Sequence, residues 1–453
     1  MRNLIAVIVV ALAVFATGCI SRQLKSDIDD YTRAAAARAH AEDVSPAVQP
    51  DEVMQGVAGD GTLGGYVMVA LERNPAIAAA RGRWLAAKAR VVTESSLEDP
   101  MVMYARFVKE VDERRDAGFS QQIPTPPKLT VRGRAAREEA AMVEQEYMAM
   151  ALDIAMNVKN AYHELYYIKN ALAVTRENGD ILKSVIQIAQ AQLRANKATQ
   201  GDVLKAQVEY DKNDSDILML EQEWESMLAD FNTLLYRPLS SEVVVPETIE
   251  MNENVPQPEE LYREALKRRP EILRADAAIR QSGAMLLLAK LKRVPDMTIG
   301  VDWMQMLMME GGTDGAVRLT FGFNLPIWLD KLKARELEAR ALQAAAEAER
   351  DSIAGMAFSR VRSTHYKYIT AKKLEALYAD SLLPHAEQAL KLSKTGYEAA
   401  KIDILDVLDS QRTLLMFKLA RLRAAVDRYQ RLAELERAVG MPLTREPASG
   451  DSK

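Results

Sequence analysis

Two stretches of this chain decide its fold because each is a version of the other: Leu71–Val91, LERNPAIAAARGRWLAAKARV, and Leu266–Leu286, LKRRPEILRADAAIRQSGAML. Both carry an arginine two residues before a proline, Pro75 in the first stretch and Pro270 in the second. Matching landmarks follow at similar offsets through the rest of the chain. A period this long is no short solenoid repeat, and it indicates a duplicated unit whose two copies pack side by side.

We therefore expect a first repeat in residues 63–250 and a second in residues 251–443. Each repeat is predicted to contain a short helix, a strand hairpin, a very long helix and a return helix. Residues 1–18 are interpreted as a signal peptide, 19–62 as a polar, lipid-anchored linker of low order, and 444–453 as a disordered tail.

The composition excludes several classes of function. Charged residues make up 27% and aromatic residues only 6%, which is typical of long amphipathic helices. The net charge of -5 provides no basic stripe, so no nucleic-acid partner is expected. No phosphate-binding loop or nucleophile elbow occurs and the four histidines are scattered, so we predict neither an enzyme nor a cofactor.

The N-terminus is similar to a bacterial lipoprotein signal. Arg2 precedes the apolar run Leu4–Phe15 and the small-residue sequence Ala16–Cys19, which predicts cleavage before Cys19 and a covalent lipid on that cysteine. Ile20 in place of aspartate favours an outer-membrane address. The alternative is an ordinary secretory signal that happens to contain a cysteine. Beyond Cys19 no run approaches the roughly 18 apolar residues of a spanning helix, so strands would have to cross any membrane.

Four segments have the alternation of strands: Met101–Val108, Ala117–Pro124, Asp296–Leu307 and Ala316–Pro326. In the last of them one face is apolar and the other polar. Four such strands cannot close a membrane barrel, since the smallest closed ones need about eight. An open sheet edge in lipid leaves backbone groups unsatisfied. The chain is therefore predicted to oligomerise.

The helices are predicted to be very long. No proline occurs between Lys128 and Arg237, and the only expected break is near Arg194–Asp202. The second repeat copies this pattern, with a kink expected at Pro384. Helices of this length are too long for a compact globule, so we expect a coiled-coil-like wall.

From about Leu63 to Leu443 the chain resembles the TolC-like outer membrane efflux proteins. The resemblance rests on the duplicated NPAI and RPEI helices, on FGFNLPIW before the second long helix, and on DILDVLDSQRTLL after the second turn. It implies a mainly α fold with a small β part. It also implies a homotrimer in which four strands per chain contribute to a 12-stranded transmembrane β-barrel below a long-helix, coiled-coil-like barrel.

The function implied by the resemblance is that of an exit duct in a tripartite efflux or secretion system. The duct would stand in the outer membrane of a Gram-negative bacterium, with its helical part in the periplasm. Its partners would be outer-membrane lipid, a periplasmic adaptor protein and an inner-membrane pump of the RND or ABC type. The alternative is a lipid-anchored periplasmic helical scaffold without pore activity.

Asp406 and Asp409 stand three residues apart and therefore share one helix face, and the first repeat has Asp202 in place of Asp406. The resemblance implies that acidic residues here line the periplasmic mouth, so we interpret these three as a gate. Stacked carboxylate rings would raise one another's pKa and attract cations. The alternative is that these acids stabilise a helix N-terminus.

The resemblance also implies that the two helical turns contact the adaptor. The predicted contact residues are Asn196, Lys197, Ala198, Ala400, Lys401, Ile402 and Asp403. Family members often have glycine at these turns, and here we assign Ala198 and Ala400 to those places.

Methionines gather in two of the strand segments, at Met101 and Met103 and again at Met304, Met306, Met308 and Met309. Thioethers suit Cu(I). Methionine also fills irregular apolar surfaces, which is the interpretation we prefer from the sequence, so no metal site is predicted.

Overall fold

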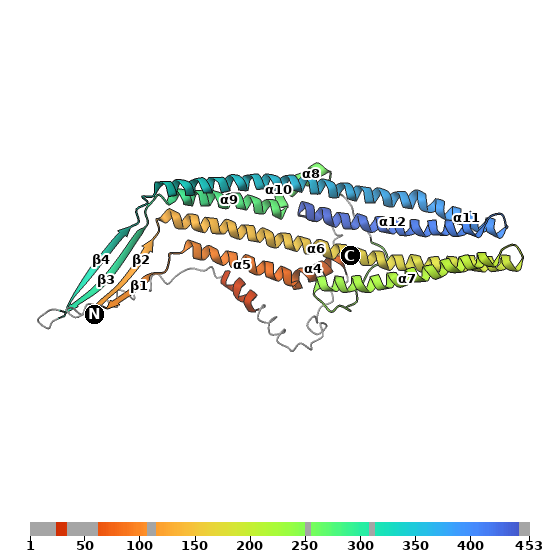
Figure 1. The fold of residues 1–453 in the computed structure, drawn as a ribbon, viewed down its shortest axis with the longest axis horizontal. Coiled ribbons are helices and arrows are strands. Elements are labelled where there is room, and N and C mark those ends of the chain that lie inside the picture. The colour runs from red at the N-terminus through yellow and green to blue at the C-terminus, as the bar shows by residue number, and fades with distance from the viewer. Residues whose placement is uncertain (1–23, 34–61, 107–114, 250–254, 308–312, 444–453) are drawn as a thin grey trace, which may run out of the picture. The chain divides into compact units, whose positions relative to one another are not determined.

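A computed structural model describes residues 24–33, 62–106, 115–249, 255–307 and 313–443 (Figure 1). It divides into two compact units, each of which takes segments from both repeats. The first unit holds Ala80–Tyr147 and Glu271–Ile353 with the helix at residues 24–33, and the second holds Met148–Pro270 and Ala354–Lys453 with the segment before Ala80. The predicted signal peptide, Cys19 and the tail at residues 444–453 lie outside the described residues.

The described elements follow the predicted order in both repeats, each with one further short helix at its start. The helices are α4 Leu63–Arg73, α5 Pro75–Ser95, α6 Pro126–Arg194, α7 Gln200–Leu235, α8 Pro258–Arg268, α9 Pro270–Leu291, α10 Leu329–Leu377, α11 Leu383–Glu398 and α12 Ile404–Val439, with a π-helical turn η1 Tyr378–Leu382 before α11. The strands are β1 Met101–Arg106, β2 Arg115–Ile123, β3 Met297–Leu307 and β4 Thr313–Phe323. The predicted fold class, mainly α with a small β part, is confirmed.

Prolines set the limits of several helices. The Asn74 side chain accepts the amide of Ala76 at 2.9 Å, and Pro75 opens α5 at a position where its missing N–H costs nothing. In the second repeat Pro384 follows η1 directly. Because proline cannot donate to the carbonyl four residues earlier, the helix widens there. The interruption expected at Pro384 is confirmed.

One stretch differs from its prediction. Residues 24–33 form a helix inside the segment that we expected to be a low-order linker. Tyr31 from this helix lies against Gly82 of α5, where a Cβ would collide with the tyrosine hydroxyl. Lys88 of α5 also lies 3.9 Å from Asp27. The missing side chain at Gly82 therefore lets the N-terminal helix pack within the first unit, a contact that the linker's polar composition did not indicate.

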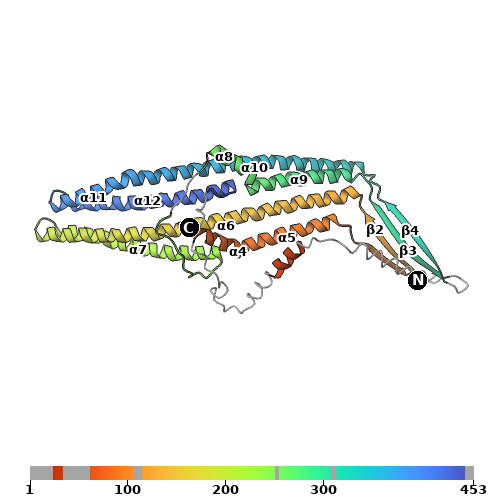
Figure 2. The ribbon, with the colours of Figure 1, turned by 180° about the vertical axis from the view of Figure 1, so that it is seen from behind.

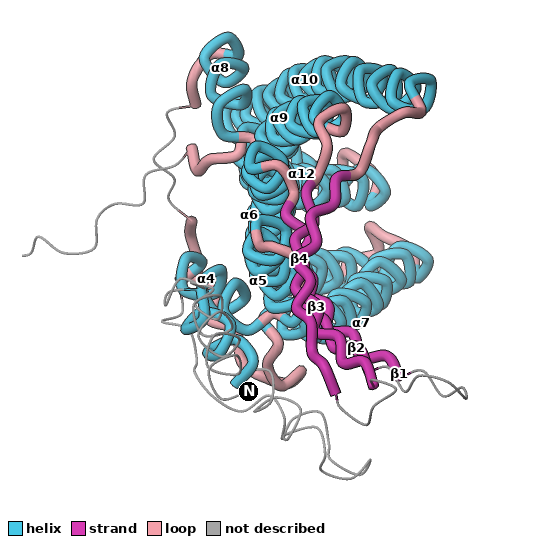
Figure 3. The backbone as a smooth tube through the Cα atoms, turned by 90° about the vertical axis from the view of Figure 1, so that its left-hand side faces the viewer, coloured by secondary structure: helices cyan, strands magenta, loops and turns pink. Residues whose placement is uncertain are grey.

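The four strands form one antiparallel sheet in chain order, β1-β2-β3-β4 (Figure 3). Directly opposed residues share a face of a sheet, so the register defines rows across it. One row is apolar: Val102 of β1, Phe119 of β2, Val301 of β3 and Leu319 of β4. In this row the apolar positions of all four strands therefore meet on one face of the sheet.

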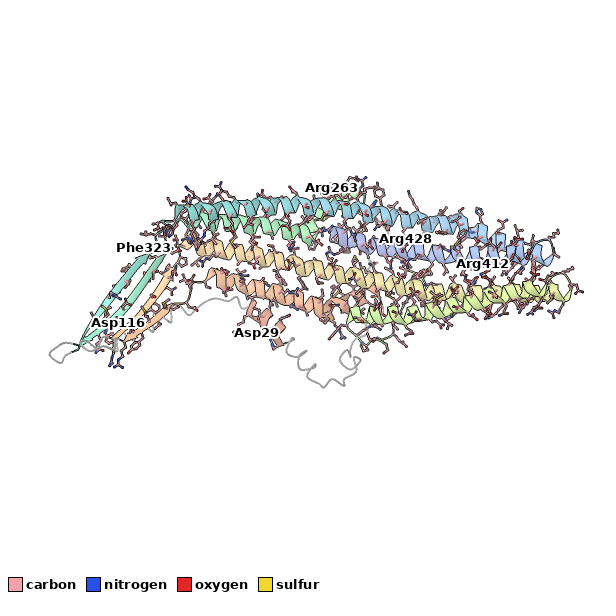
Figure 4. The ribbon with its side chains drawn as sticks, in the orientation of Figure 1. Asp29, Asp116, Arg263, Phe323, Arg412 and Arg428 are labelled. Atoms are coloured by element: carbon pink, nitrogen blue, oxygen red, sulfur yellow. The ribbon has the colours of Figure 1, made fainter. Side chains whose placement is uncertain are left out.

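The two faces of the sheet differ sharply in chemistry. On the apolar face Leu319 is 65%, Phe321 70% and Phe323 63% exposed, and Figure 4 labels Phe323 where β4 ends. On the polar face Arg318 donates to Asp302 at 3.0 Å and Thr320 donates to the same carboxylate at 3.1 Å. A continuous exposed apolar patch is rare on a monomeric soluble protein and marks a surface that something else covers.

In the second unit α6 is tied to α12 by ion pairs. Arg423 lies 2.7 Å from Glu164, and Lys159 lies 2.6 Å from Glu436. Arg428 of α12, labelled in Figure 4, pairs with Glu375 of α10 at 2.7 Å. Within the ranges that the structure describes, no helix combines the length and the apolar character needed to cross a membrane.

A buried ion pair fixes the junction of strands and helices in the first unit. Lys128 of α6, only 1% exposed, donates to Asp296 at 2.7 Å and to the Val294 carbonyl at 2.6 Å. Asp296 also accepts the amide of Thr125 at 3.0 Å, and its own amide donates to the Asn324 side chain. The residues that lead into β3 are thereby held against the start of α6 and the end of β4.

We predict that Lys128→Met destabilises the protein by about 3–5 kcal/mol, because it leaves the Asp296 carboxylate buried without its cation. Thermal unfolding of the purified protein measures this. The matched control is Lys331→Met, because Lys331 follows β4 as Lys128 follows β2 but is exposed. Its effect should stay within about 0.5 kcal/mol. If Lys128→Met and Lys331→Met destabilised the protein equally, Lys128 would have no special role as the partner of the buried Asp296 carboxylate.

Candidate functional site at the two helical turns

The turns α6–α7 and α11–α12 belong to the second unit and have the same backbone structure. Asn196 and Ala400 take left-handed conformations with φ of 56° and 57°. The next amides, of Lys197 and Lys401, each bond the carbonyl five residues earlier at 2.9 Å. This is the Schellman pattern of a helix C-terminus, in which glycine or asparagine is favoured at the left-handed position.

The structure corrects one assignment at these turns. The left-handed residue of the first turn is Asn196, two positions before the predicted Ala198, whereas Ala400 is where we expected it. Asparagine tolerates this conformation because its short polar side chain can bond locally. The first turn therefore needs no glycine. The residue equivalent to the family's glycine is Asn196, and the predicted Ala198 lies two positions after it.

The helices after the turns begin at equivalent places. Thr199 is the N-cap of α7 and Asp403 is the N-cap of α12, which makes Asp202 and Asp406 the third residues of their helices. Thr199 and Asp202 form a reciprocal capping box, and in α12 the Asp403 side chain accepts the Leu405 amide at 3.1 Å. The structural equivalence of Asp202 and Asp406 agrees with the repeat.

Asp202 is committed to the start of its own helix. Its pKa is lowered, first by the hydrogen bond from the Thr199 backbone amide at 2.8 Å and also by Lys205, whose ammonium lies 3.5 Å away. This is the capping role that the sequence left open as the alternative to a gate. The ionised carboxylate therefore has a local structural use in the single chain.

Asp406 and Asp409 are both exposed on α12. The sequence did not reveal the cation beside them, Arg412, which lies one turn after Asp409 and is labelled in Figure 4. Its guanidinium Nε donates to Glu209 of α7 at 3.0 Å. The pKa of Arg412 is raised, first by this hydrogen bond, and the charge of Asp409 adds to the effect. Asp409 therefore lies in the field of a paired arginine.

A buried group of amides links three helices of the second unit. Asn178 of α6 donates to Asn213 of α7 at 2.8 Å and accepts from Gln411 of α12. These polar side chains lie beside an apolar cluster that joins α6, α7, α11 and α12: Leu182, Val185, Ala189, Val203, Ala206, Leu383, Ala386, Leu390, Tyr397, Ile404, Val407, Leu408 and Leu414. The ends of the four helices thus share one core.

The turns also touch each other directly. Gln192 near the end of α6 donates to the Glu398 carbonyl at the end of α11, at 2.6 Å. Figure 2 shows α7 beside α6 and α12 beside α11 in this unit. The predicted contact residues Lys197, Lys401 and Asp403 are exposed at this end, whereas Ile402 is half-buried against Gly396. The two turns therefore present one surface with two similar halves.

Comparisons with known proteins place this arrangement in a class. Residues 261–441 match the model of the family described as outer membrane efflux protein. The chain is 24% identical over 321 residues to the pyoverdine export outer membrane protein OpmQ of Pseudomonas aeruginosa, covering 66% of this chain and 65% of OpmQ. The match thus spans slightly less than two thirds of that relative.

Two further matches agree. The cobalt-zinc-cadmium resistance protein CzcC of Cupriavidus metallidurans is 22% identical, with 69% of this chain and 74% of CzcC covered. The open-state structure of the Neisseria gonorrhoeae MtrE outer membrane channel superposes with a TM-score of 0.72 at 20% identity, covering 89% of this chain and 97% of that one.

The fold is that of the outer membrane channels, a sheet of four strands continued by duplicated long helices. Over residues 261–441 the chain matches the outer membrane efflux proteins, and the sequence landmarks pointed to the TolC-like proteins of the same kind. That family consists of efflux proteins, so the prediction that the chain is not an enzyme is also confirmed.

We predict that Ala400→Gly stabilises the second turn by about 0.5–1 kcal/mol, because it removes the Cβ strain of a left-handed alanine. Slower amide hydrogen exchange at Lys401 and a higher unfolding temperature would show it. Ala399→Gly is the control, since the neighbouring residue has an ordinary helical φ of −77°. That change should destabilise the turn by about 0.5–1 kcal/mol. If Ala400→Gly and Ala399→Gly shifted the unfolding temperature in the same direction, the proposed strain at Ala400 would be rejected.

Proposed function

We propose that this chain is a passive exit duct in the outer membrane for an efflux or secretion system. The observation that carries the proposal is the sheet, whose exposed apolar face suits lipid while its opposite face carries Asp302 and Arg318. Three chains would pool their strands into one closed barrel, as the family resemblance implies, because four strands are too few to close one. The polar faces would then surround the lumen.

Energy and selectivity would come from partners. The relatives are named for different compounds, pyoverdine for OpmQ and cobalt, zinc and cadmium for CzcC, so what they share is the role of a conduit. An inner-membrane pump of the RND or ABC type would select the cargo. A periplasmic adaptor would join the pump to the turn surface at Asn196–Ala198 and Ala400–Asp403. The equivalent Schellman turns support this, because they offer an adaptor two similar docking positions in each chain.

The gate would consist mainly of Asp406 and Asp409. Both are exposed on α12, so in a trimer they can form two carboxylate rings that favour cations. Asp202 would contribute less, because its carboxylate is held in the capping box. The Arg412–Glu209 pair beside Asp409 would set how strongly that ring attracts cations. The rival function, a periplasmic scaffold without a pore, predicts no conductance in a planar bilayer.

The gate assignment predicts the behaviour of a double variant, Asp406→Ala with Asp409→Ala. Removing the carboxylates should weaken block by divalent cations roughly tenfold, which corresponds to about 1.4 kcal/mol, and should lower cation selectivity. Single-channel recording measures both quantities. Asp214→Ala, which removes an exposed acid further along α7, is the control and should leave both unchanged. Unaltered block in the double variant rejects the gate.

Anchoring makes a separate prediction. If Cys19 carries the lipid, Cys19→Ala should abolish labelling by radioactive palmitate, because the thiol is the attachment point of the lipid. Cys19 is the single cysteine of the chain, so no other thiol can take the label. Incorporation is followed on the immunoprecipitated protein, and Ser21→Ala serves as the matched control. Persistent labelling of the cysteine variant would remove the anchor from the proposal.

A further inference from the structure

The strand methionines do not lie where apolar filling residues should. Met103 of β1 opposes Gly118 of β2, which opposes Asp302 of β3 and then Arg318 of β4. Met101 opposes Ser120 in the neighbouring row of the same face. Because directly opposed residues share a face, both thioethers belong to the polar face of the sheet.

Side-chain contacts confirm which face this is. Arg318 and Thr320 both donate to Asp302, so all three side chains project from the same side. A Cβ on Gly118 would collide with the Asp302 carboxylate, so that carboxylate leans across β2 toward the strand that carries Met103. On β3, Met304 opposes Asp116, which Figure 4 labels. The methionines therefore lie among carboxylates and an arginine.

The apolar-filling interpretation predicts the opposite arrangement. Methionines that supplement a greasy surface should alternate in step with Phe321 and Phe323, as Met297 does by opposing Phe323. Met101, Met103 and Met304 are out of step with them. The side chains of Met306, Met308 and Met309 lie outside what the structure describes. For Met101, Met103 and Met304 the register therefore does not match the apolar filling that we preferred from the sequence.

The spacing suits a ligand of known chemistry. Residues i and i+2 of a strand lie about 6.7 Å apart along one face, and methionine has three rotatable side-chain bonds. Two sulfurs on such stems can converge on one cation between them. Met101 is 65% and Met103 58% exposed, so both are accessible. Thioethers are soft, neutral ligands that select Cu(I) and similar ions over hard divalent cations.

We propose that Met101 and Met103 form a binding site for soft monovalent cations, Cu(I) or Ag(I), on the polar face of the sheet. Met304 provides a further thioether on that face, beside the Asp116 carboxylate. Within the described residues no group of three or more His, Cys, Asp or Glu side chains could hold a metal, so the site differs in kind from a zinc site.

The proposed binding site follows from the register of the strands, but its role in transport rests on the proposed function. If the polar faces line a lumen, soft cations pass this pair on their way out. Thioethers are neutral, so they bind a cation without the charge attraction that a thiolate ligand would add, which favours rapid exchange over retention. The site would therefore be a contact point for soft-metal cargo and no resident metal centre.

The test uses the purified full-length protein with Met ε-methyl groups labelled with ¹³C and titrated with Ag(I). Wild-type protein should show methyl shifts at Met101 and Met103 and a matching heat of binding. Met101→Leu with Met103→Leu preserves volume and apolarity while removing both sulfurs. We expect at least a roughly tenfold loss of Ag(I) affinity, since even the loss of a residue that only supports a metal ligand costs about that much.

Met219→Leu is the matched control, since Met219 is 59% exposed and lies on α7, a helix of the second unit. It should bind Ag(I) like wild type, and Zn(II) should shift neither methyl group. Equal Ag(I) affinity of the double variant and wild type, or no shift at Met101 and Met103, overturns the site. Bilayer recording separates the two proposals. Ag(I) binding without conductance would reject the duct and leave the metal site. Conductance without Ag(I) binding would reject the metal site and leave the duct.

Discussion

The uncovered apolar face of the four-stranded sheet is the constraint on which the rest of the structure depends. Phe321, Phe323 and their cross-strand neighbours make a surface that water does not favour, and the two edge strands leave backbone groups without partners. A single chain satisfies neither requirement by internal packing. Both would be met if identical chains completed one another's sheet and lipid covered the outside, which is the arrangement that we propose for this protein.

The buried interactions serve that arrangement. In the first unit the Lys128–Asp296 pair fixes the path of the chain between the strands and the helices. The sheet therefore keeps a defined orientation relative to the residues that join it to the helices. In the second unit the Asn178, Asn213 and Gln411 amides lie beside an apolar cluster. Buried polar groups are costly unless paired, so such a group favours one alignment of α6, α7 and α12. Contacts between apolar residues alone would allow these helices to slide along one another.

The acidic residues near the turns differ in their partners and in the charges around them. Asp202 and Asp406 are equivalent in the repeat, yet one is held in a capping box and the other is exposed, because Thr199 and Asp403 cap their helices differently. Arg412 places a cation next to Asp409 through a bond to Glu209, a residue from the other repeat. The two repeats thus have similar turns, and differences in single residues give the turns different charge environments.

The sequence by itself determined the order of elements, the proline-bounded helices and the two-faced strands, because these depend on local periodicity and on the missing N–H of proline. It also gave the equivalence of Asp202 and Asp406. It could not give the left-handed position at Asn196, the packing of Tyr31 on Gly82 or the Arg412–Glu209 bond, which depend on backbone geometry or on residues far apart in the chain. The face of Met101 and Met103 was likewise decided only by strand register, since a shift of one residue would turn both thioethers to the other side.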